Sequence, residues 1–334
     1  MPNFINSFGY SLEPVHTGMI VYLCDLWNEG KKEPLRAFLD HLRIPFGKHY
    51  KLRTAREHKN IDLVIFDAEN DYPIVSVEMK VDSHEGWVKG EHQTVFYPTL
   101  LPEGTPFLYV TLGVGEYYHA PYGKQAQWVR IREFHGALEA SSDDDPLICG
   151  WREAIANEID LQDRCFSGDM SRIDEYRGRT WSLYLLGHLK ERLITSLPDL
   201  TDAGIDPTMY AHPPGPDAIL NFGESKHPTY MEINNNGLLN LKTNLEGLAT
   251  SEQKEACFES TRVHYQALLE EFKPSLNMRR LNPTAKSKTI MSFDVGLNSR
   301  NGNLRYASTE AETLRTLAEV LLKFYRTPDP ALPC

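Results

Sequence analysis

The chain has 334 residues, of which 41% are hydrophobic and 24% charged, a composition that suits a globular protein with one large core or two modest ones. Its formal net charge of −11 argues against binding of polyanions by overall charge, and its five scattered cysteines, with no CxxC pair, argue against a disulfide framework or a structural zinc site. No apolar run reaches the roughly 18 to 20 residues of a membrane span, and the chain does not start with a basic region followed by an apolar stretch, so we expect a cytoplasmic protein without a membrane partner.

Helical and strand patterns alternate in the first third of the chain. Apolar residues at helical spacing predict a helix over Thr17–Glu29, which Thr17 would cap and Gly30 would end. The same spacing predicts helices over Glu33–Leu42 and near His92–Tyr97. Segments rich in β-branched residues predict strands at 49–57, 61–67, 73–81, 106–113 and near Trp128. The sequence therefore predicts a mixed α/β unit with a mixed central sheet flanked by helices.

The acidic stretch Ser141–Asp145, closed by Pro146, indicates a loop between two regions. We expect one domain at 1–145 and an α+β region at 146–334 that serves substrate binding or oligomerisation. In that region Asn234–Gly237 predicts a hairpin turn, residues 202–218 read as a connector, and Thr309 with Glu312 has the spacing of a capping box. Helices are predicted at 151–158, 173–195, 252–272 and 309–325, and strands at 229–233, 238–244 and 289–295.

Three polar residues interrupt the apolar strands of the segment 60–81. Because side chains alternate along a strand, Glu78 and Lys80 lie on one face, about 6.6 Å apart at roughly 3.3 Å per residue. If a five-residue loop at 68–72 joins the two strands, Asp62 faces Glu78. Opposed carboxylates destabilise a sheet unless positive charge lies between them, and a divalent cation together with Lys80 would supply it.

This arrangement favours phosphodiester chemistry. Mg²⁺ prefers a few carboxylate oxygens with open positions for water and phosphate, and it polarises a phosphoryl oxygen and lowers the pKa of a bound water. Lys80 could orient or deprotonate the attacking water, or neutralise charge in the transition state.

These residues resemble the PD-(D/E)XK nuclease superfamily, which has a restriction-endonuclease-like fold. The resemblance rests on Asp62 and on Glu78-Met79-Lys80, and it spans about residues 17–130. It implies that Asp62, Glu78 and the Met79 carbonyl bind Mg²⁺, for which Mn²⁺ would substitute, and that Lys80 is the catalytic lysine.

The resemblance extends to the helix after the second strand. Gln93 and Tyr97 have the spacing of a Gln and Tyr pair in one branch of the superfamily, so Gln93 would be an accessory catalytic residue. Ile61 stands where the motif name has proline, and Pro98 shortens the helix. The acidic residue that many members carry on the first helix has three candidates here, Glu13, Asp25 and Glu29.

Other segments leave two interpretations open. The stretch 273–288 is basic and contains no acid, so it is either a surface for DNA phosphates or a solvated loop. The Tyr-rich loop 115–125 could stack on bases or pack locally. The residues concerned in the basic stretch are Lys273, Arg279, Arg280, Lys286 and Lys288, and three histidines lie near the predicted site in sequence, His84, His92 and His119.

The sequence thus predicts a Mg²⁺-dependent deoxyribonuclease, with DNA as its main partner and with a role in restriction or phage defence implied by the resemblance. A homo-oligomer or a partner protein is compatible with the second region. One alternative is a catalytically inactive protein of the same fold that binds DNA or a protein as a regulator. Another is an interaction protein in which the hairpin is an ordinary part of the sheet.

Overall fold

The computed structural model of the chain comprises two compact units, Met1–Asp163 and Arg164–Cys334. The residues that the structure describes are 3, 5, 7, 9–47, 51–117, 120–141, 144–167, 180–196, 200, 202–203, 205, 207–211, 218–223, 229–234, 237–243, 245, 248, 250–272, 277–279, 289–294 and 311–327.

The first unit is built on a five-stranded sheet in the order β1-β2-β3-β6-β7. Neighbours among β1, β2 and β3 pair antiparallel, whereas β3, β6 and β7 pair parallel, so the predicted mixed sheet is confirmed. The bounds are β1 (Leu52–His58), β2 (Ile61–Asp67), β3 (Tyr72–Lys80), β6 (Phe107–Thr111) and β7 (Ala126–Arg130), and a separate hairpin consists of β4 (Trp87–Val88) and β5 (Glu91–His92).

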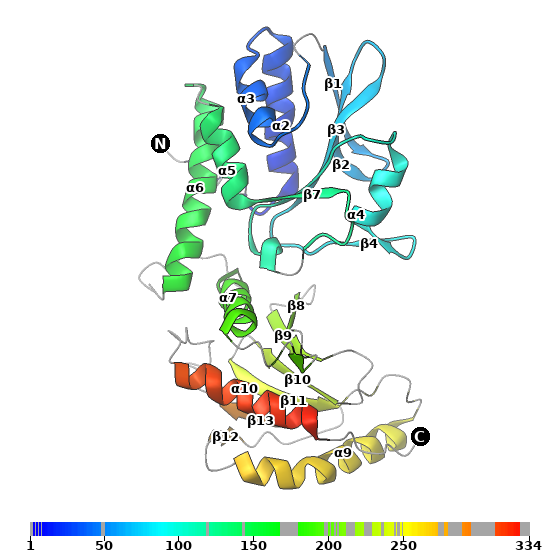
Figure 1. Ribbon diagram of the computed structural model, residues 1–334, viewed down its shortest axis with the longest axis vertical. Coiled ribbons are helices and arrows are strands. Elements are labelled where there is room, and N and C mark those ends of the chain that lie inside the picture. Colours follow the sequence, from blue (N-terminus) through cyan, green and yellow to red (C-terminus); the bar gives the residue numbers. More distant parts are fainter. Residues whose placement is uncertain are drawn as a thin grey trace. The chain divides into compact units, whose positions relative to one another are not determined.

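Helices cover both faces of this sheet, because successive side chains along its strands point to opposite faces and both faces carry apolar residues. Leu63, Val77 and Met79 belong to the larger core, while Val64 and Phe66 belong to a smaller one on the opposite face. Figure 1 shows α2, α3 and α5 on one side of the sheet and α4 on the other. The bounds are α2 (Glu13–Asn28), α3 (Glu33–His41), α4 (Gln93–Phe96), η1 (Tyr97–Leu100), η2 (Val114–Tyr117), α5 (Ile131–Ala140) and α6 (Pro146–Ser167).

The predicted start of the first helix is wrong. α2 begins at Glu13, with Pro14 in its first turn, where the missing N–H of proline costs no helical hydrogen bond. Thr17 lies inside the helix, and its Oγ1 donates to the Pro14 carbonyl at 3.2 Å. The predicted end is confirmed, because Gly30 has φ of 95° just beyond Asn28.

Two elements of the first unit were not predicted, the β4–β5 hairpin and α5. Phe134 of α5 packs edge-to-face against Phe38 of α3, with ring centroids 5.3 Å apart. The unit also extends to Asp163 rather than ending near residue 145, because Trp151 and Ile155 of α6 are fully buried in the same core.

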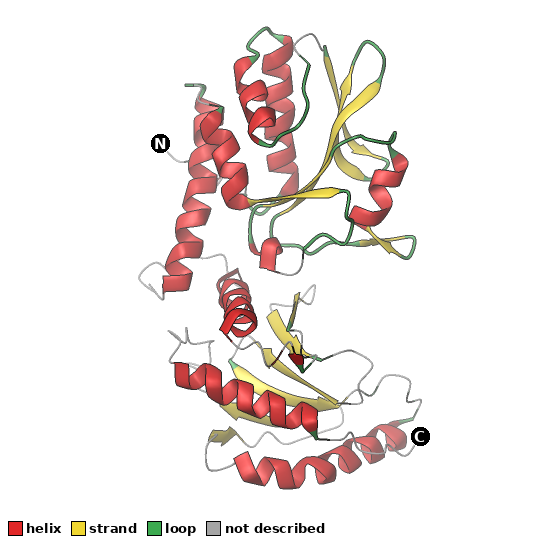
Figure 2. Cartoon of the chain, in the orientation of Figure 1, coloured by secondary structure: helices red, strands yellow, loops and turns green. Residues whose placement is uncertain are grey.

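The second unit contains a six-stranded antiparallel sheet in the order β12-β13-β11-β10-β9-β8, and Figure 2 shows its helices in red beside its strands in yellow. The hydroxyl of Tyr265, in α9, lies 3.2 Å from the hydroxyl of Thr229 on β10. The Tyr265 ring stacks on the ring of Phe324 in α10. The bounds are α7 (Thr180–Ser196), β8 (Thr208–Ala211), β9 (Ala218–Phe222), β10 (Thr229–Asn234), β11 (Leu238–Thr243), α9 (Ser251–Phe272), β12 (Asn277–Arg279), β13 (Thr289–Asp294) and α10 (Ala311–Arg326).

The hairpin predicted in this unit is confirmed, since β10 and β11 pair antiparallel around Gly237, which has φ of 74°. The segment 202–218, predicted as a connector, contains the strand β8, and β8, β9 and β12 were not predicted. Thr309 of the predicted capping box lies outside the described residues. In the part of the chain that the structure describes, no helix is long and apolar enough to cross a membrane.

Candidate active site

The β2–β3 hairpin brings Asp62 beside the end of β3. Leu63 lies opposite Val77, in the predicted register, and the backbone ladder between the two strands ends there. Beyond that pair the Asp62 carboxylate replaces the backbone as acceptor: its Oδ2 accepts the Met79 N–H at 2.7 Å. Asp62 is thereby fixed next to Glu78, as the register predicted.

The turn end of the same hairpin differs from the prediction. Asp67 lies opposite Tyr72 and not opposite Pro73, so the connecting loop is one residue shorter than expected. A bulge after Ile65 gives β3 one extra residue and cancels this difference. Two opposite errors of one residue therefore left the register at the acidic end correct, which matters because a slip of one residue turns every side chain to the other face.

Glu78 and Lys80 form a buried ion pair on one face of β3. Lys80 Nζ lies 2.8 Å from Glu78 Oε1, and the side chains are only 8% and 1% exposed. The second carboxylate oxygen, Glu78 Oε2, is buried and makes no hydrogen bond with the described part of the chain. An unsatisfied buried carboxylate oxygen is costly, so it marks a position where a further positive or hydrogen-bonding group would be stabilised.

The carboxylates are held in an environment that opposes their charge. Burial raises the pKa of Glu78 to about 7, and the neighbouring Asp62 carboxylate acts in the same direction against the opposing effect of Lys80. Burial also raises the pKa of Asp62, although Lys80 and the Met79 N–H partly offset it. Burial by itself would lower the pKa of Lys80, but Glu78, Glu13 and Asp62 together raise it, so Lys80 keeps its proton at neutral pH. The cluster has more carboxyl groups than ammonium groups, so a bound cation would stabilise the charged carboxylates.

Glu13 is the acidic residue of the first helix that reaches this site. Its Oε1 accepts the hydroxyl of Ser83 and, at 3.4 Å, the backbone N–H of Val81, just after β3. Asp25 and Glu29 lie at the other end of α2 and are exposed. Sequence spacing alone left the three acids equivalent, and the signal that separates them is Pro14, which marks the helix start and so places Glu13 in its first turn.

Gln93 supports the site from α4 without a hydrogen bond to Asp62, Glu78 or Lys80 among the described contacts. Its Oε1 accepts the Gly86 N–H at 2.7 Å, which fixes the orientation of the amide. Its Nε2 then donates to the Tyr97 hydroxyl at 3.1 Å. Burial raises the pKa of Tyr97, and the hydrogen bond from Gln93 opposes this rise.

Two glycines let the loop after β6 lie against the end of β3. A Cβ on Gly113 would stand 2.7 Å from the Val81 carbonyl oxygen, and one on Gly115 would stand 2.9 Å from that of Ser83 and 3.5 Å from Lys80 Cβ. Side chains at these positions would force the backbone apart. The close packing of this loop therefore helps to fix Lys80 in place.

The donor set suits a hard cation that keeps open positions. Among the described residues, no three His, Cys, Asp or Glu side chains converge to hold a metal by themselves. Mg²⁺ does not need such a cage, since it binds through one or two carboxylates and otherwise keeps water or phosphate as ligands. Because the N–H of Met79 faces Asp62, its carbonyl points toward the same side of β3. The orphaned Glu78 Oε2, the Asp62 carboxylate and the Met79 carbonyl thus fit the predicted ligands.

Other predicted residues are not brought to this site by the described contacts. Arg279 lies in β12 of the second unit, and nothing is described of its side chain. His84 is exposed, while His92 packs in the β4–β5 hairpin. Arg280, Lys286, Lys288, Lys273 and His119 lie outside the described residues.

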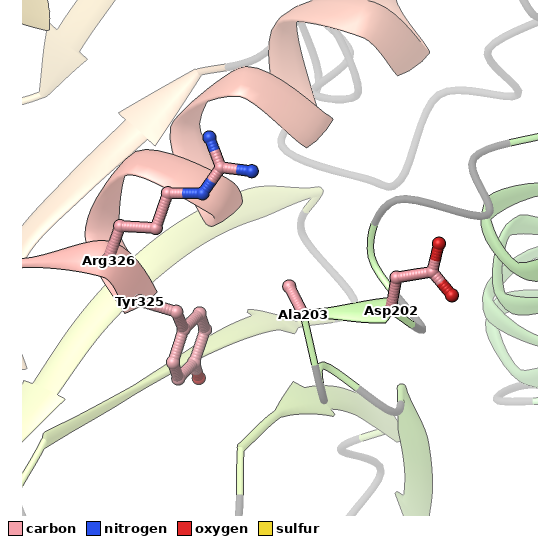
Figure 3. Close-up of a pocket in the computed structure, with 4 residues that line it drawn as sticks. All are labelled: Asp202, Ala203, Tyr325 and Arg326. Carbon is pink, nitrogen blue, oxygen red and sulfur yellow. The ribbon is translucent and has the colours of Figure 1, made fainter.

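The second unit contains a pocket of its own. It has a volume of about 390 Å³ and is lined by Asp202, Ala203, Tyr325 and Arg326. In Figure 3 the Asp202 carboxylate points away from the Arg326 guanidinium, and both side chains belong to exposed residues. Nothing in this lining converges on a ligand.

Comparison of the chain with protein-family models, curated proteins and solved structures finds no match. The functional interpretation therefore depends on the geometry around Asp62, Glu78 and Lys80.

Proposed function

We propose that this protein is a metal-dependent deoxyribonuclease of the PD-(D/E)XK type that hydrolyses DNA phosphodiester bonds. The observation that carries the proposal is the buried cluster of Asp62, Glu78 and Lys80, in which Glu78 Oε2 has no hydrogen-bond partner among the described residues. Most buried side-chain polar atoms of native proteins have a hydrogen-bond partner, so an unpaired carboxylate oxygen needs an explanation. A role in restriction or phage defence stays a prediction from the resemblance.

The topology supports a restriction-endonuclease-like core. A helix precedes three antiparallel strands, the third of these pairs parallel with β6, and β6 pairs parallel with β7. The acid-bearing ends of β2 and β3 lie together, with Glu13 of the first helix beside them. This arrangement agrees with the fold that the resemblance implies.

The chemistry follows from the charges. A Mg²⁺ ion held by Asp62, Glu78 and the Met79 carbonyl would polarise a phosphate oxygen and lower the pKa of a bound water. Lys80, kept protonated by Glu78, contributes a fixed positive charge next to the position where negative charge develops. Glu13 holds the Ser83 hydroxyl and the backbone after β3, so it orients the strand end that carries Lys80.

A cleavage assay with a matched control tests the proposal. Supercoiled, linear and single-stranded DNA, and RNA, are incubated with Mg²⁺, Mn²⁺ or EDTA and the parent protein, Asp62→Asn or Asp67→Asn. Asp67 is a buried acid at the other end of β2, and the Asn variant keeps an oxygen to accept the Glu69 N–H. We expect metal-dependent DNA cleavage by the parent and Asp67→Asn and a loss of about 10²- to 10⁴-fold in Asp62→Asn. DNA binding without cleavage by the parent would favour the inactive regulator, and no effect on any nucleic acid would reject both.

A further inference from the structure

Three aromatic rings are stacked beside the candidate active site and form what we call the aromatic stack, Trp87, His92 and Tyr122. The His92 and Tyr122 rings lie face to face, with centroids 3.5 Å apart and planes 11° apart. Trp87 lies opposite His92 across the β4–β5 hairpin, with ring centroids 4.1 Å apart. Trp87 is 66% exposed and Tyr122 is 53% exposed, so large flat apolar surface faces solvent.

The hairpin that presents Trp87 is rigid. Its turn consists of Lys89 and Gly90, both with positive φ (52° and 86°), which is the tight two-residue turn that matches strand twist. The residue before Trp87, Gly86, donates its N–H to Gln93 Oε1 at 2.7 Å. Both ends of the hairpin are therefore held, because Gln93 also directly follows His92 in the chain.

The loop that carries Tyr122 is fixed to the same helix. Glu85 is buried, and its Oε1 accepts the Thr94 N–H at 2.6 Å. Thr94 Oγ1 in turn accepts the Gly123 N–H at 2.8 Å, and a Cβ on Gly123 would collide with the Thr94 carbonyl at 2.0 Å. Single exposed aromatic residues are ordinary, but three rings in contact on anchored backbones form a prepared surface.

The aromatic stack is joined to the candidate catalytic residues by the short segment 81–86, which runs from Lys80 to Trp87. Its Ser83 hydroxyl donates to Glu13 beside the end of β3, and its Gly86 N–H donates to Gln93 Oε1 at 2.7 Å. The stack and the candidate site therefore belong to one continuous part of the first unit.

The charge of the first unit favours stacking over electrostatic attraction. Residues 1–163 contain 15 Lys and Arg against 25 Asp and Glu, a formal charge of −10. Affinity for a polyanion must then come from contacts that do not depend on overall charge, together with local cations. Lys89 and Lys124 are exposed and each follows a ring of the stack by two residues in the chain, with Lys89 Nζ over the Phe96 ring at 5.2 Å from its centroid.

We propose that the aromatic stack binds an unpaired DNA base through Trp87, so that the substrate is single-stranded DNA or a frayed or flipped position in a duplex. Bases inside a duplex already stack on one another and offer no free face, whereas an unpaired base can stack on an exposed indole. This proposal rests on the proposed nuclease function, whose site it extends from the phosphate to the base.

Binding of short oligonucleotides by fluorescence anisotropy tests the proposal independently of cleavage. All proteins carry Lys80→Ala, and Mg²⁺ is present. Trp87→Ala is compared with Trp87→Phe, which keeps a ring, and with Tyr72→Ala, which removes another aromatic residue that is 49% exposed, at the β2–β3 turn. We expect Trp87→Ala to weaken binding of single-stranded DNA about 5- to 150-fold, with Trp87→Phe retaining most of the affinity and Tyr72→Ala unchanged.

Oligonucleotides with one base removed at successive positions identify the contact. At one position, removal of the base should weaken the affinity of the parent for the oligonucleotide by the same factor as the Trp87→Ala substitution does. The affinity of Trp87→Ala should not change when that base is removed. Equal binding of single strands by the parent and Trp87→Ala overturns the stacking proposal. Tighter binding of RNA of the same sequence overturns the assignment to DNA.

The outcomes separate the two proposals. Metal-dependent DNA cleavage with unchanged single-strand binding by Trp87→Ala leaves the nuclease and removes the stacking contact. Position-specific binding through Trp87, in a protein whose Lys80-containing form cleaves nothing, leaves the stacking contact and removes the nuclease. Circular dichroism of each variant verifies that the first unit stays folded.

Discussion

Two hairpins in this chain carry the same pattern of acid and lysine, one in each unit. In β2–β3, Asp62 lies beside Glu78, and Lys80 follows two residues later. In β10–β11, Glu232 lies opposite Asn240, and Lys242 follows two residues later. The ion-pair distances are nearly equal, 2.8 Å for Lys80–Glu78 and 2.9 Å for Lys242–Glu232.

The difference is the balance of charge. The second hairpin has one carboxylate and one ammonium, and the amide of Asn240 is hydrogen-bonded to the Ser292 hydroxyl. At the end that carries Lys80, the first hairpin has two carboxyl groups for one ammonium and leaves Glu78 Oε2 without a partner in the described residues. A carboxylate and a lysine in a sheet therefore do not by themselves indicate a metal site, and the proposed site differs from the second hairpin in its additional buried carboxyl group.

Exchange of the two lysines for methionine should give the largest difference. Met keeps most of the aliphatic stem and removes the charge. We expect Lys80→Met to reduce DNA cleavage about 10²- to 10⁴-fold, because the fixed charge next to the phosphate is lost. Lys242→Met should cleave at the parental rate, measured on the same plasmid with Mg²⁺. Equal losses in both variants would remove the distinction between the hairpins.

The pH dependence of stability should distinguish Glu78. The pKa of Glu78 is about 7 in the folded protein and has its ordinary value of 4.5 in the unfolded chain. The folded state binds the extra proton between these values, so the free energy of unfolding falls as the pH rises from about 5 to about 8. Glu78→Gln should be more stable than the parent by about 2–3 kcal/mol at pH 8 and nearly equal to it at pH 5.

Urea unfolding in EDTA measures this difference. Glu69→Gln, an exposed glutamate at the β2–β3 turn, is the control and should follow the parent at every pH. Parallel stability curves for the parent and Glu78→Gln would show that Glu78 does not carry the burial cost that we assign to it.

A second carboxylate introduced into the β10–β11 hairpin should recreate the excess of carboxyl groups found beside Lys80 in the β2–β3 hairpin. Asn240→Glu places a second carboxylate opposite Glu232, and we expect a loss of about 1–3 kcal/mol in the stability of the second unit. Mg²⁺ should restore part of this loss, whereas Asn240→Gln should be insensitive to Mg²⁺. Urea unfolding with and without Mg²⁺ provides the measurement, and an Asn240→Glu variant as stable as Asn240→Gln would contradict the role of charge balance.

Loss of the Gln93 amide should have the smallest effect. Gln93→Leu leaves the Gly86 N–H without its acceptor, which we expect to cost about 1 kcal/mol in the first unit. Gln125→Leu, on an exposed loop, is the control and should be neutral. Thermal unfolding compares the two, and a neutral Gln93→Leu would show that the hairpin next to the site is held by other contacts.

Local patterns predicted most elements, and the failures have local causes. The alternation in 61–67 and 73–81 was sufficient to predict β2 and β3, but their register near Asp62 came out correct because the shorter turn and the bulge after Ile65 compensate each other. The β4–β5 hairpin was missed because each strand has two residues and its turn contains Lys89 rather than Asn or Asp. β8 was missed because it lies among prolines and glycines that usually mark turns.

By itself the sequence determined that Glu78 and Lys80 share a face, since the period of a strand fixes this. The position of Asp62 beside Glu78 was predicted from a register in which two errors of one residue cancelled. Only the tertiary structure decided which acid of the first helix joins them, because Glu13 contacts the backbone of Val81, 68 residues away in the chain. It also decided that one hairpin is left with excess charge while the other is neutral. Burial and partners from distant segments set the cost of a charge, and no local pattern contains that information.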